Sequence, residues 1–543
     1  MTTPQATPST PRRLAAVLLL ALAVRAAVLV CESRLPLFTH HRLDAQMYDE
    51  AGRVIASGDW LFGHGAYFFN PLYAYLVGVV YATLGAGPWP IRVVQLVFGL
   101  GNVALIYDSA RRVAGDRWGS AAGVIAALYG PFAFFETQLL SEGFGAFLQS
   151  LLMWAVLRAF AAPEGRGLVA RWAAIGATLG LCVLTRGNAV FLTVPVALAA
   201  LWAGGGARPL AALVLGGALS LAPVTARNIV RTGHFAVLTA HGGVNLYVGN
   251  GPGASGTYRI PDEVPSSGSN RDAMVEYRRV AERRMGRRLT LVEADRYWRD
   301  LTLRTIAAHP VTWLRLLVEK TWLFWNAREI PNTEDYEFMR TLDPALGLPL
   351  VQFGTVAPFA LMGTLMLLAS RRREDRFLAA FNLAGCASLV AFFVLARYRL
   401  PCVPGLIVAA VVWLRDVKVA WDARRTRTLV ASALGVALAA VVVFWPKLPT
   451  LFDDQYFKLG FAWHVQGHLP EAEDAYRNAL RLTPTHLSAR KNLAMLLESR
   501  GDLDGARREW EVLLRVAPTQ MPTGARYLDE AREHLRALGA PAP

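Results

Sequence analysis

Apolar stretches long enough to cross a membrane recur along the chain, and they constrain its fold more than any other feature. The hydrocarbon core of a bilayer is about 30 Å thick, which a helix of about 20 residues crosses. Backbone polar groups inside that core must be satisfied within the chain, so the apolar stretches predict a polytopic, all-α bundle. The eleven predicted spans are 14–30, 92–110, 118–135, 143–160, 168–185, 188–204, 209–225, 346–369, 377–395, 402–415 and 428–446.

The composition agrees with a membrane protein. Of the 543 residues, 54% are hydrophobic and 18% are charged, and the mean hydropathy is +0.31. A net charge of +15 would also suit nucleic-acid binding. The basic residues, however, cluster beside the apolar stretches, as they do in cytoplasmic loops. We therefore expect membrane lipids, and no nucleic acid, as partners. The four cysteines show neither metal-ligand spacing nor a disulfide framework.

Basic clusters set the predicted orientation. Arg12 and Arg13 precede the first span and place the N-terminus in the cytoplasm. The first 12 residues are polar and predicted to be disordered, and residues 13–447 form the membrane domain. In this scheme two long regions, 32–91 and 226–345, lie on the external face.

Two further apolar segments leave their relation to the membrane open. Residues 71–87 are short and punctuated by glycine and proline, and residues 310–326 carry Arg315, Glu319 and Lys320. Charges at membrane depth are costly. We therefore expect both segments on the external side of the bilayer, lying on it or entering it without crossing.

The C-terminal residues 448–543 are soluble in character and contain a repeat. The repeating positions are Leu459-Gly460, Gly467, Ala472, Tyr476, Ala479 and Pro484, and 34 residues later Leu493-Ala494, Gly501, Ala506, Trp510, Leu513 and Pro518. This pattern resembles the tetratricopeptide repeat (TPR), in which each unit is a helical hairpin. The resemblance implies an α-solenoid that contacts a protein partner, with residues 525–538 as a capping helix. A spacer without a binding role is the alternative.

The first external loop gathers carboxylates, histidines and aromatic residues between Thr39 and Pro71. A helix is predicted from Asp44 to Ser57, with Asp44 and Tyr48 on one side because they are four residues apart. Aromatic rings follow this helix, and such rings favour the headgroup level of a bilayer. The loop is thus predicted to present a carboxylate at the membrane boundary, although an ordinary solvated helix would show a similar pattern.

Two more polar clusters share the external face in this topology. One is Glu136 to Glu142, and the other is Arg397-Tyr398-Arg399. Paired guanidinium groups bind phosphate oxygens well, and external arginines run against the usual charge distribution. Anchoring to lipid headgroups is the alternative for these arginines. Together with Asp44, the two glutamates leave a divalent cation possible, but the sequence shows no definite metal site.

The ordered motifs of residues 10–445 resemble the membrane glycosyltransferases of the C-type (GT-C) fold. Within that class the chain looks like the protein O-mannosyltransferase and lipid A aminoarabinose transferase group. The matching first-loop residues are Asp44, Tyr48, Arg53, Gly58, Asp59, Trp60, Asn70, Pro71 and Arg92. Later matches are Ala222-Pro223, Arg227-Asn228, Gly242-Gly243, Asn245-Leu246-Tyr247, Gly249-Asn250 and Ala396 to Pro401.

This resemblance implies transfer of a sugar from a polyprenyl-phosphate donor to an acceptor at the external face of a bacterial inner or cell membrane. The acceptor would be a glycan, lipid or protein, and the TPR domain would then be external. Asp44 is implied as the catalytic base and, with a single base, transfer would invert the anomeric centre. Asp49 and Glu50 are alternative bases. Arg397, Arg399 and Tyr398 are expected to bind the donor phosphate.

Further substrate-binding candidates come from the same pattern: Tyr48, Glu136, Glu142, Arg227, Asn245 and Asn250. The chain departs from the group at two positions. Ala45 follows Asp44 where the protein mannosyltransferases carry a glutamate, and Glu142 stands where an aspartate is common. The first difference argues against a protein mannosyltransferase proper. A transporter or flippase, or a non-catalytic scaffold acting through the repeats, remains the alternative function.

Overall fold

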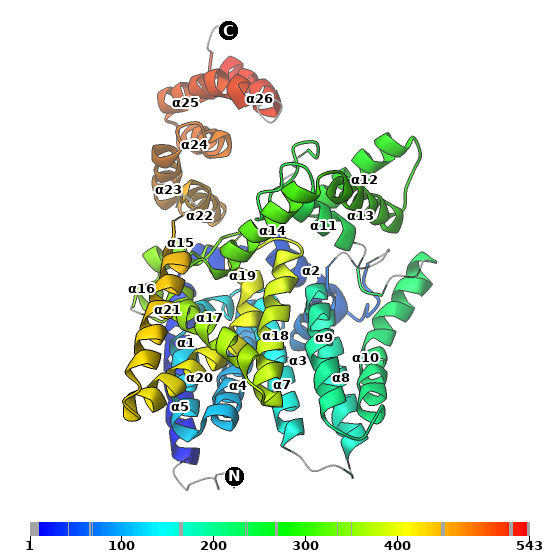
Figure 1. The fold of residues 1–543 in the computed structure, drawn as a ribbon. Helices are drawn as coiled ribbons and strands as arrows, with labels where there is room; N and C mark the ends of the chain where they lie inside the picture. The colour runs from blue at the N-terminus through cyan, green and yellow to red at the C-terminus, as the bar shows by residue number, and fades with distance from the viewer. Residues whose placement is uncertain are drawn as a thin grey trace.

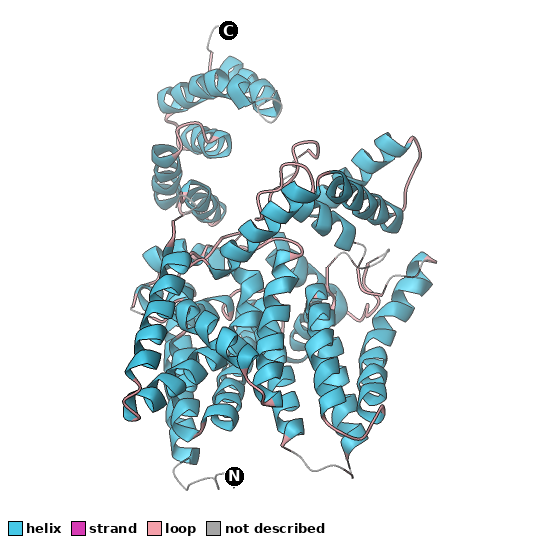
Figure 2. Ribbon diagram, viewed as in Figure 1, coloured by secondary structure: helices cyan, strands magenta, loops and turns pink. Residues whose placement is uncertain are grey.

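The described part of the chain consists of helices joined by loops and turns. The computed structural model describes residues 10–41, 43–63, 67, 69–161, 165, 167–233, 235, 237–239, 241–265, 270–333, 335–348, 350–446, 451–520 and 525–539. Within these ranges the only β feature is a single bridge between Tyr129 and Val351 (Figure 2). The all-α prediction is confirmed for these residues.

The helices follow one another along the whole chain (Figure 1). Those of the first half are α1 (Thr10–Glu32), η1 (Pro36–Phe38), α2 (Leu43–Ala56), α3 (Leu72–Leu84), α4 (Pro88–Ala114), α5 (Asp116–Leu128), α6 (Gly130–Phe135), α7 (Glu142–Phe160), α8 (Leu168–Thr185), η2 (Gly187–Leu192), α9 (Thr193–Trp202), α10 (Arg208–Thr232), α11 (Gly242–Asn250) and α12 (Asn270–Met285).

The second half continues with α13 (Leu291–Ala308), α14 (Pro310–Trp325), α15 (Tyr336–Leu342), α16 (Pro344–Gly347), α17 (Phe353–Ala369), α18 (Arg373–Val390), α19 (Ala396–Arg399), η3 (Leu400–Cys402), α20 (Val403–Asp422), α21 (Thr426–Phe444), α22 (Asp453–Val465), α23 (Leu469–Leu482), α24 (Leu487–Ser499), α25 (Leu503–Val516), η4 (Ala517–Gln520) and α26 (Ala525–Ala537). Because α1 begins at Thr10, part of the segment predicted to be disordered is helical, and residues 1–9 lie outside the described ranges.

Seven helical segments of the described chain are long and apolar enough to cross a membrane, and they identify an integral membrane protein. They are Pro11–Glu32, Pro88–Ala114, Glu142–Phe160, Leu168–Thr185, Arg208–Thr232, Ala396–Asp422 and Thr426–Phe444. The other four predicted spans fall on shorter or more polar helices: α5 with α6, η2 with α9, α17 and α18. The count of eleven spans therefore remains a prediction.

The two apolar segments whose relation to the membrane was left open, 71–87 and 310–326, also form helices, and neither helix is among these seven. Residues 72–84 form α3, whose 13 residues correspond to a length of about 20 Å. Residues 310–325 form α14, which leans over the end of the bundle from which the C-terminal domain rises (Figure 1). We call this the upper end. The helix α1 starts at the opposite, lower end.

Helix α2 is seated directly on α3, which fixes the first-loop carboxylates at the upper end. A Cβ atom on Gly52 would lie 2.4 Å from Val77, and one on Gly78 would lie 2.5 Å from Ile55. The two helices therefore approach closely at paired glycines. The Tyr48 and Tyr73 rings meet edge to face at 4.8 Å between centroids. The predicted helix from Asp44 to Ser57 is confirmed to within one residue.

A break at Tyr129 shapes the connection before α7. The helix α5 ends there, and Gly130 donates its backbone N–H to the carbonyl of Val351 at 2.9 Å. Gly130 has no room for a side chain because the Tyr336 hydroxyl occupies the position of a Cβ atom. The chain then turns through residues 136–141 and brings Glu142 to the first position of α7.

Helices α22 to α26 form a C-terminal domain with a core of its own, built on Tyr476, Leu493 and Trp510 among other residues. They stack as successive antiparallel hairpins above the upper end (Figure 1). The boundaries α22–α23 and α24–α25 follow the 34-residue period of the sequence, and α26 occupies the position of the predicted cap. Assignment to the tetratricopeptide family remains a prediction.

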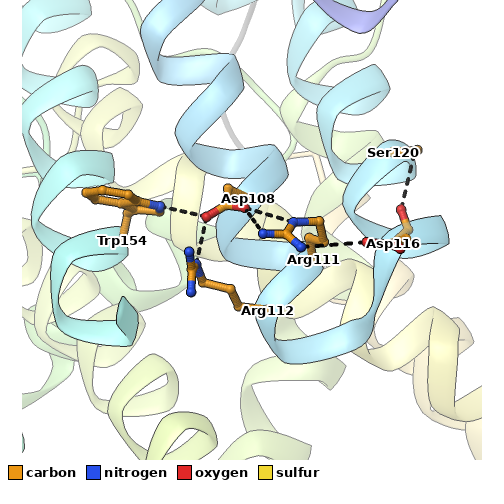
Figure 3. Close-up of polar contacts among 6 residues, drawn as sticks. All are labelled: Asp108, Arg111, Arg112, Asp116, Ser120 and Trp154. Atoms are coloured by element: carbon orange, nitrogen blue, oxygen red, sulfur yellow. Dashed lines mark hydrogen bonds and ion pairs between the residues drawn. The ribbon is translucent and has the colours of Figure 1, made fainter. Parts of the chain in front are cut away.

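At the lower end, Asp108 closes the turn between α4 and α5 (Figure 3). Its carboxylate accepts hydrogen bonds from Arg111 (2.8 and 2.5 Å), Arg112 (2.6 Å) and the Trp154 indole (2.8 Å). These contacts join the end of α4 to α7. The basic residues beside this turn therefore have part of their charge neutralised.

Replacing Asp108 with alanine should destabilise the fold by about 2 kcal/mol, because it removes several charged hydrogen bonds at once. The matched control is Asp116→Ala, since the Asp116–Arg111 ion pair is 3.8 Å long and is therefore too long for a hydrogen bond. Thermal unfolding of the detergent-solubilised protein measures both. Equal shifts in the midpoint temperatures of the two variants would contradict the stabilising role of the Asp108 hydrogen bonds.

Candidate functional site

A cavity of about 770 Å³ opens at the upper end of the bundle, and we call it the main cavity. Its walls come from α2, the start of α7, the segment between α8 and η2, α11, α18, α19 and α22. Polar residues line it, among them Asp44, Glu142, Arg186 and Arg397. Apolar residues such as Val244, Leu389 and Phe392 line it too. The volume lies in the range of small-molecule sites.

Four residues form a charged cluster with alternating signs: Asp44, Arg397, Glu142 and Arg186. Nη2 of Arg397 lies 2.5 Å from Oδ2 of Asp44, and its Nε lies 3.7 Å from Oε1 of Glu142. The same Glu142 oxygen accepts a hydrogen bond of 2.5 Å from Nη1 of Arg186. Side chains of Arg397 and Glu142 are 5% and 2% exposed, whereas Asp44 is 29% exposed. Asp44 is thus the member most open to the cavity.

The local fold explains how the cluster forms. Asp44 lies in the first turn of α2, and Glu142 lies in the first turn of α7, where carboxylates favour the positive end of a helix. Arg186 follows the last residue of α8 in an extended conformation, which directs the chain away from the helix. Arg397 belongs to the four-residue helix α19. Three of these residues lie at a helix end and the fourth lies in a single helical turn.

Tyr398 contacts both arginines of the cluster. The Arg186 guanidinium is 3.8 Å from the centre of its ring, and that of Arg397 is 4.9 Å away. Nη2 of Arg397 also donates to the Tyr398 hydroxyl at 3.2 Å. Tyr48 borders the cavity beside Asp44, and burial raises the pKa of its phenol well above the usual value. Tyr48 therefore stays neutral near pH 7.

Arg399, predicted to bind phosphate with Arg397, does not line the main cavity. It pairs with Glu329 at 2.9 Å and donates to the carbonyls of Phe324 (2.8 Å) and Asn326 (2.7 Å). Its guanidinium also lies over the Phe353 ring. Because these contacts engage a side chain that is only 2% exposed, Arg399 holds the segment that follows α14.

Glu136 lies inside the bundle rather than beside Glu142. Its oxygens accept hydrogen bonds from Nε of Arg25 at 2.7 Å and from Nη2 of Arg25 at 3.2 Å. A Cβ atom on Gly99 would be 2.1 Å from this carboxylate, so the helix α4 must carry glycine there. The two glutamates thus occupy separate sites. Among the described residues no group of three or more His, Cys, Asp or Glu side chains could hold a metal ion.

Of the remaining candidates, Asn245 lines the main cavity, whereas Arg227 and Asn250 lie outside its lining. Nη2 of Arg227 donates to the carbonyls of three residues between Leu61 and Gly63 and so holds the first loop. Asn250 accepts hydrogen bonds from Lys320 at 2.8 Å and from Trp313 at 3.1 Å. Both contacts join segments of the upper end to one another.

Sequence reasoning missed Arg186, although a signal was present. Arg186 falls between the predicted spans 168–185 and 188–204, at their external ends. The same departure from the usual charge distribution had drawn attention to Arg397. His241 and Lys458 also line the cavity. No pattern in the sequence singles them out, because only the folded chain brings α11 and α22 to the same site.

His241 gives the site a testable pH dependence. Burial lowers the pKa of its imidazole to about 4, whereas an unfolded histidine titrates near 6.5. Between these values the unfolded chain binds a proton that the folded chain does not. Stability should therefore fall as the pH drops from about 6.5 toward 4, and this contribution should be constant above pH 7.

The variant His241→Asn should narrow the difference in thermal midpoint between pH 7 and pH 5. Some difference should persist, because burial lowers the pKa of His41 to about 4 as well. Exposed His309 provides the control variant His309→Asn. An unchanged difference in His241→Asn, or an equal narrowing in both variants, would exclude His241 as a source of the effect.

Comparisons with known proteins give similarities in three respects. Over 53 residues the chain is 49% identical to the probable biofilm formation methyltransferase WspC of Pseudomonas aeruginosa, which is 10% of this chain and 13% of that protein. The chain thus spans about an eighth of the length of this curated relative.

Among solved structures, ArnT from Cupriavidus metallidurans bound to undecaprenyl phosphate is 15% identical, with a TM-score of 0.42, over 98% of this chain and 88% of that one. The Archaeoglobus fulgidus oligosaccharyltransferase in complex with zinc and sulfate is 16% identical, also with a TM-score of 0.42. That match covers 82% of this chain and 55% of the other, so the chain spans just over half the length of that protein.

Residues 69–226 match the family model of dolichyl-phosphate-mannose-protein mannosyltransferases. The matched region includes two members of the charged cluster, Glu142 and Arg186, and excludes Asp44 and Arg397. The match supports a glycosyltransferase that resides in a membrane.

Proposed function

We propose that this protein transfers a sugar from a polyprenyl-phosphate donor to an acceptor hydroxyl at the external face of the membrane. The observation that carries the proposal is the charged cluster: an accessible carboxylate, the buried Arg397 and the partly buried Arg186 share one cavity at the end of a membrane bundle. The family description supports the donor class, because a dolichyl-phosphate mannose is a polyprenyl-phosphate sugar. In this scheme the upper end is the external, periplasmic end.

The chemistry needs a base and positive charge. The acceptor oxygen attacks the anomeric carbon, the bond from that carbon to the phosphate oxygen breaks, and the acceptor proton passes to Asp44. Attack opposite the leaving phosphate inverts the anomeric centre. The phosphate leaves as a stable anion, so it requires cations and no general acid.

Arg186 and Arg397 are the proposed phosphate ligands. Guanidinium groups bind phosphate oxygens through paired hydrogen bonds, and both groups lie close to the Tyr398 ring. In this arrangement Arg186 takes the part first expected of Arg399. The phosphate competes with Asp44 for Arg397, whose Nη2 now lies 2.5 Å from that carboxylate. Donor binding would loosen this pair and make Asp44 a better base.

The variant Asp44→Asn should lower transfer at least 100-fold, because the amide cannot accept the acceptor proton. The matched control is Asp49→Asn on the same helix, since Asp49 pairs with Arg53 at 2.9 Å and lies outside the main cavity. Purified protein in nanodiscs receives a radiolabelled polyprenyl-phosphate sugar and membranes from cells that lack the gene. Persisting transfer in Asp44→Asn, or an equal loss in Asp49→Asn, would refute Asp44 as the base.

The variants Arg186→Lys and Arg397→Lys should weaken binding of undecaprenyl phosphate about tenfold or more. Lysine keeps the charge opposite Glu142 but loses the paired hydrogen bonds, and tenfold corresponds to about 1.4 kcal/mol. Arg399→Lys should leave binding near that of the unmodified protein and lower thermal stability instead. Weaker lipid binding in Arg399→Lys alone would contradict this assignment and make Arg399, rather than Arg186 and Arg397, the phosphate ligand.

A further inference from the structure

The C-terminal domain is attached to the membrane domain through its first helix, α22. Nε2 of Gln466, just beyond that helix, donates to the carbonyl of Pro36 and to Oγ1 of Thr39, each at 3.0 Å. Nζ of Lys458 donates to the carbonyl of Thr333 at 3.1 Å. These hydrogen bonds fasten α22 to the first loop and to the segment before α15.

Aromatic contacts complete this attachment. The Phe338 ring of α15 lies 4.9 Å from the Tyr456 ring and 5.4 Å from the Phe452 ring, measured between centroids. On the other side the His40 and Phe461 rings are 5.6 Å apart. Each such pair contributes about 1 kcal/mol beyond its buried area. The helix α22 therefore keeps a fixed position against the membrane domain.

Two charged residues of α22 reach the main cavity. Asp454 and Lys458 both line it, and they form an ion pair of 2.6 Å four residues apart on the helix. The Lys458 side chain is 15% exposed and that of Asp454 is 58% exposed. Lys458 also lines a smaller neighbouring cavity of about 60 Å³. A protein module that only tethers or spaces would not need to furnish a wall of the site.

The position of α22 indicates which substrate it meets. The C-terminal domain rises beyond the ends of the membrane helices (Figure 1), so α22 borders the cavity on the side that faces water. A donor with a polyprenyl tail must enter from the side of the spans, because the tail stays in the bilayer. The water-facing side is left for the acceptor.

We infer that α22 forms the acceptor-binding wall of the main cavity, with Lys458 and Asp454 as specificity-determining residues. The inference rests on the proposed function. It assigns the acceptor a chemical class: besides its reactive hydroxyl, it carries a second polar or charged group that exchanges hydrogen bonds with this ion pair. The C-terminal domain thereby takes part in substrate selection.

Two readouts test this assignment in the full chain. Radiolabelled polyprenyl-phosphate sugar is given to protein in nanodiscs, first in buffer, where water is the acceptor, and then with membranes from cells lacking the gene. Lys458→Gln and Asp454→Asn should reduce incorporation into these membranes about tenfold at limiting membrane concentration. Excess membranes should restore it. Donor hydrolysis in buffer should be unchanged.

The control is Arg477→Gln in α23. Arg477 pairs with Glu473 at 2.7 Å, also four residues apart, and this ion pair does not line the cavity. Equal incorporation by Lys458→Gln, Asp454→Asn and Arg477→Gln would overturn the inference. If unmodified protein neither hydrolyses nor transfers the sugar, the proposed function itself fails, which is a different result.

A second variant, modified only after the protein has folded, separates an effect on acceptor binding from an effect on folding. Lys458→Cys, labelled with a bulky maleimide after folding, should lose incorporation while donor hydrolysis continues. Arg477→Cys, labelled in the same way, should keep both incorporation and hydrolysis. Cys182, Cys386 and Cys402 are buried, so Cys31, which is partly exposed, is first replaced with serine. Unimpaired incorporation by labelled Lys458→Cys would overturn the inference independently of the first experiment.

Discussion

The alternation of charge from Asp44 through Arg397 and Glu142 to Arg186 is the constraint on which the upper end of the molecule depends. An arginine buried without a counter-charge costs several kcal/mol, as does a buried carboxylate. Each member therefore requires its neighbours. The four residues come from α2, α7, the end of α8 and α19, so segments as far apart as residues 44 and 397 are tied to one another by electrostatics rather than by apolar packing alone.

Close helix contacts make this arrangement possible. The paired glycines of α2 and α3 bring α2 down onto the bundle. Similarly, a Cβ atom on Gly176 would lie 2.0 Å from the carbonyl of Leu213, and one on Gly216 would lie 1.9 Å from that of Ala173. Small residues let membrane helices approach where no hydrophobic driving force exists between them. The α8–α10 pair is thereby held together, and with it the position of Arg186 at the end of α8.

The sequence predicted the helices and three members of the cluster, Asp44, Glu142 and Arg397, because apolar length and charge beside it are local signals. Asp44 and Arg397 both stand out as charges at the predicted external ends of apolar segments. Arg399 was grouped with Arg397 by proximity in sequence, yet residues two apart on a helix point about 160° away from each other, and Arg399 faces Glu329. Glu136 likewise turns toward Arg25. Which way a side chain points, and that α22 reaches the cavity, are properties of tertiary packing that no single-sequence pattern carries.

The cluster holds two carboxylates and two guanidinium groups, so it is close to neutral without substrate. A polyprenyl-phosphate sugar is a phosphodiester with one negative charge, whereas the released polyprenyl phosphate carries between one and two. In the proposed reaction Asp44 takes up a proton and loses its own negative charge as the leaving phosphate gains one. The total charge within the low-dielectric cavity thus stays constant through the transfer. A base beside the phosphate-binding arginines therefore limits the electrostatic cost of forming the product anion. If the base lay elsewhere, the arginines alone would have to compensate the added negative charge.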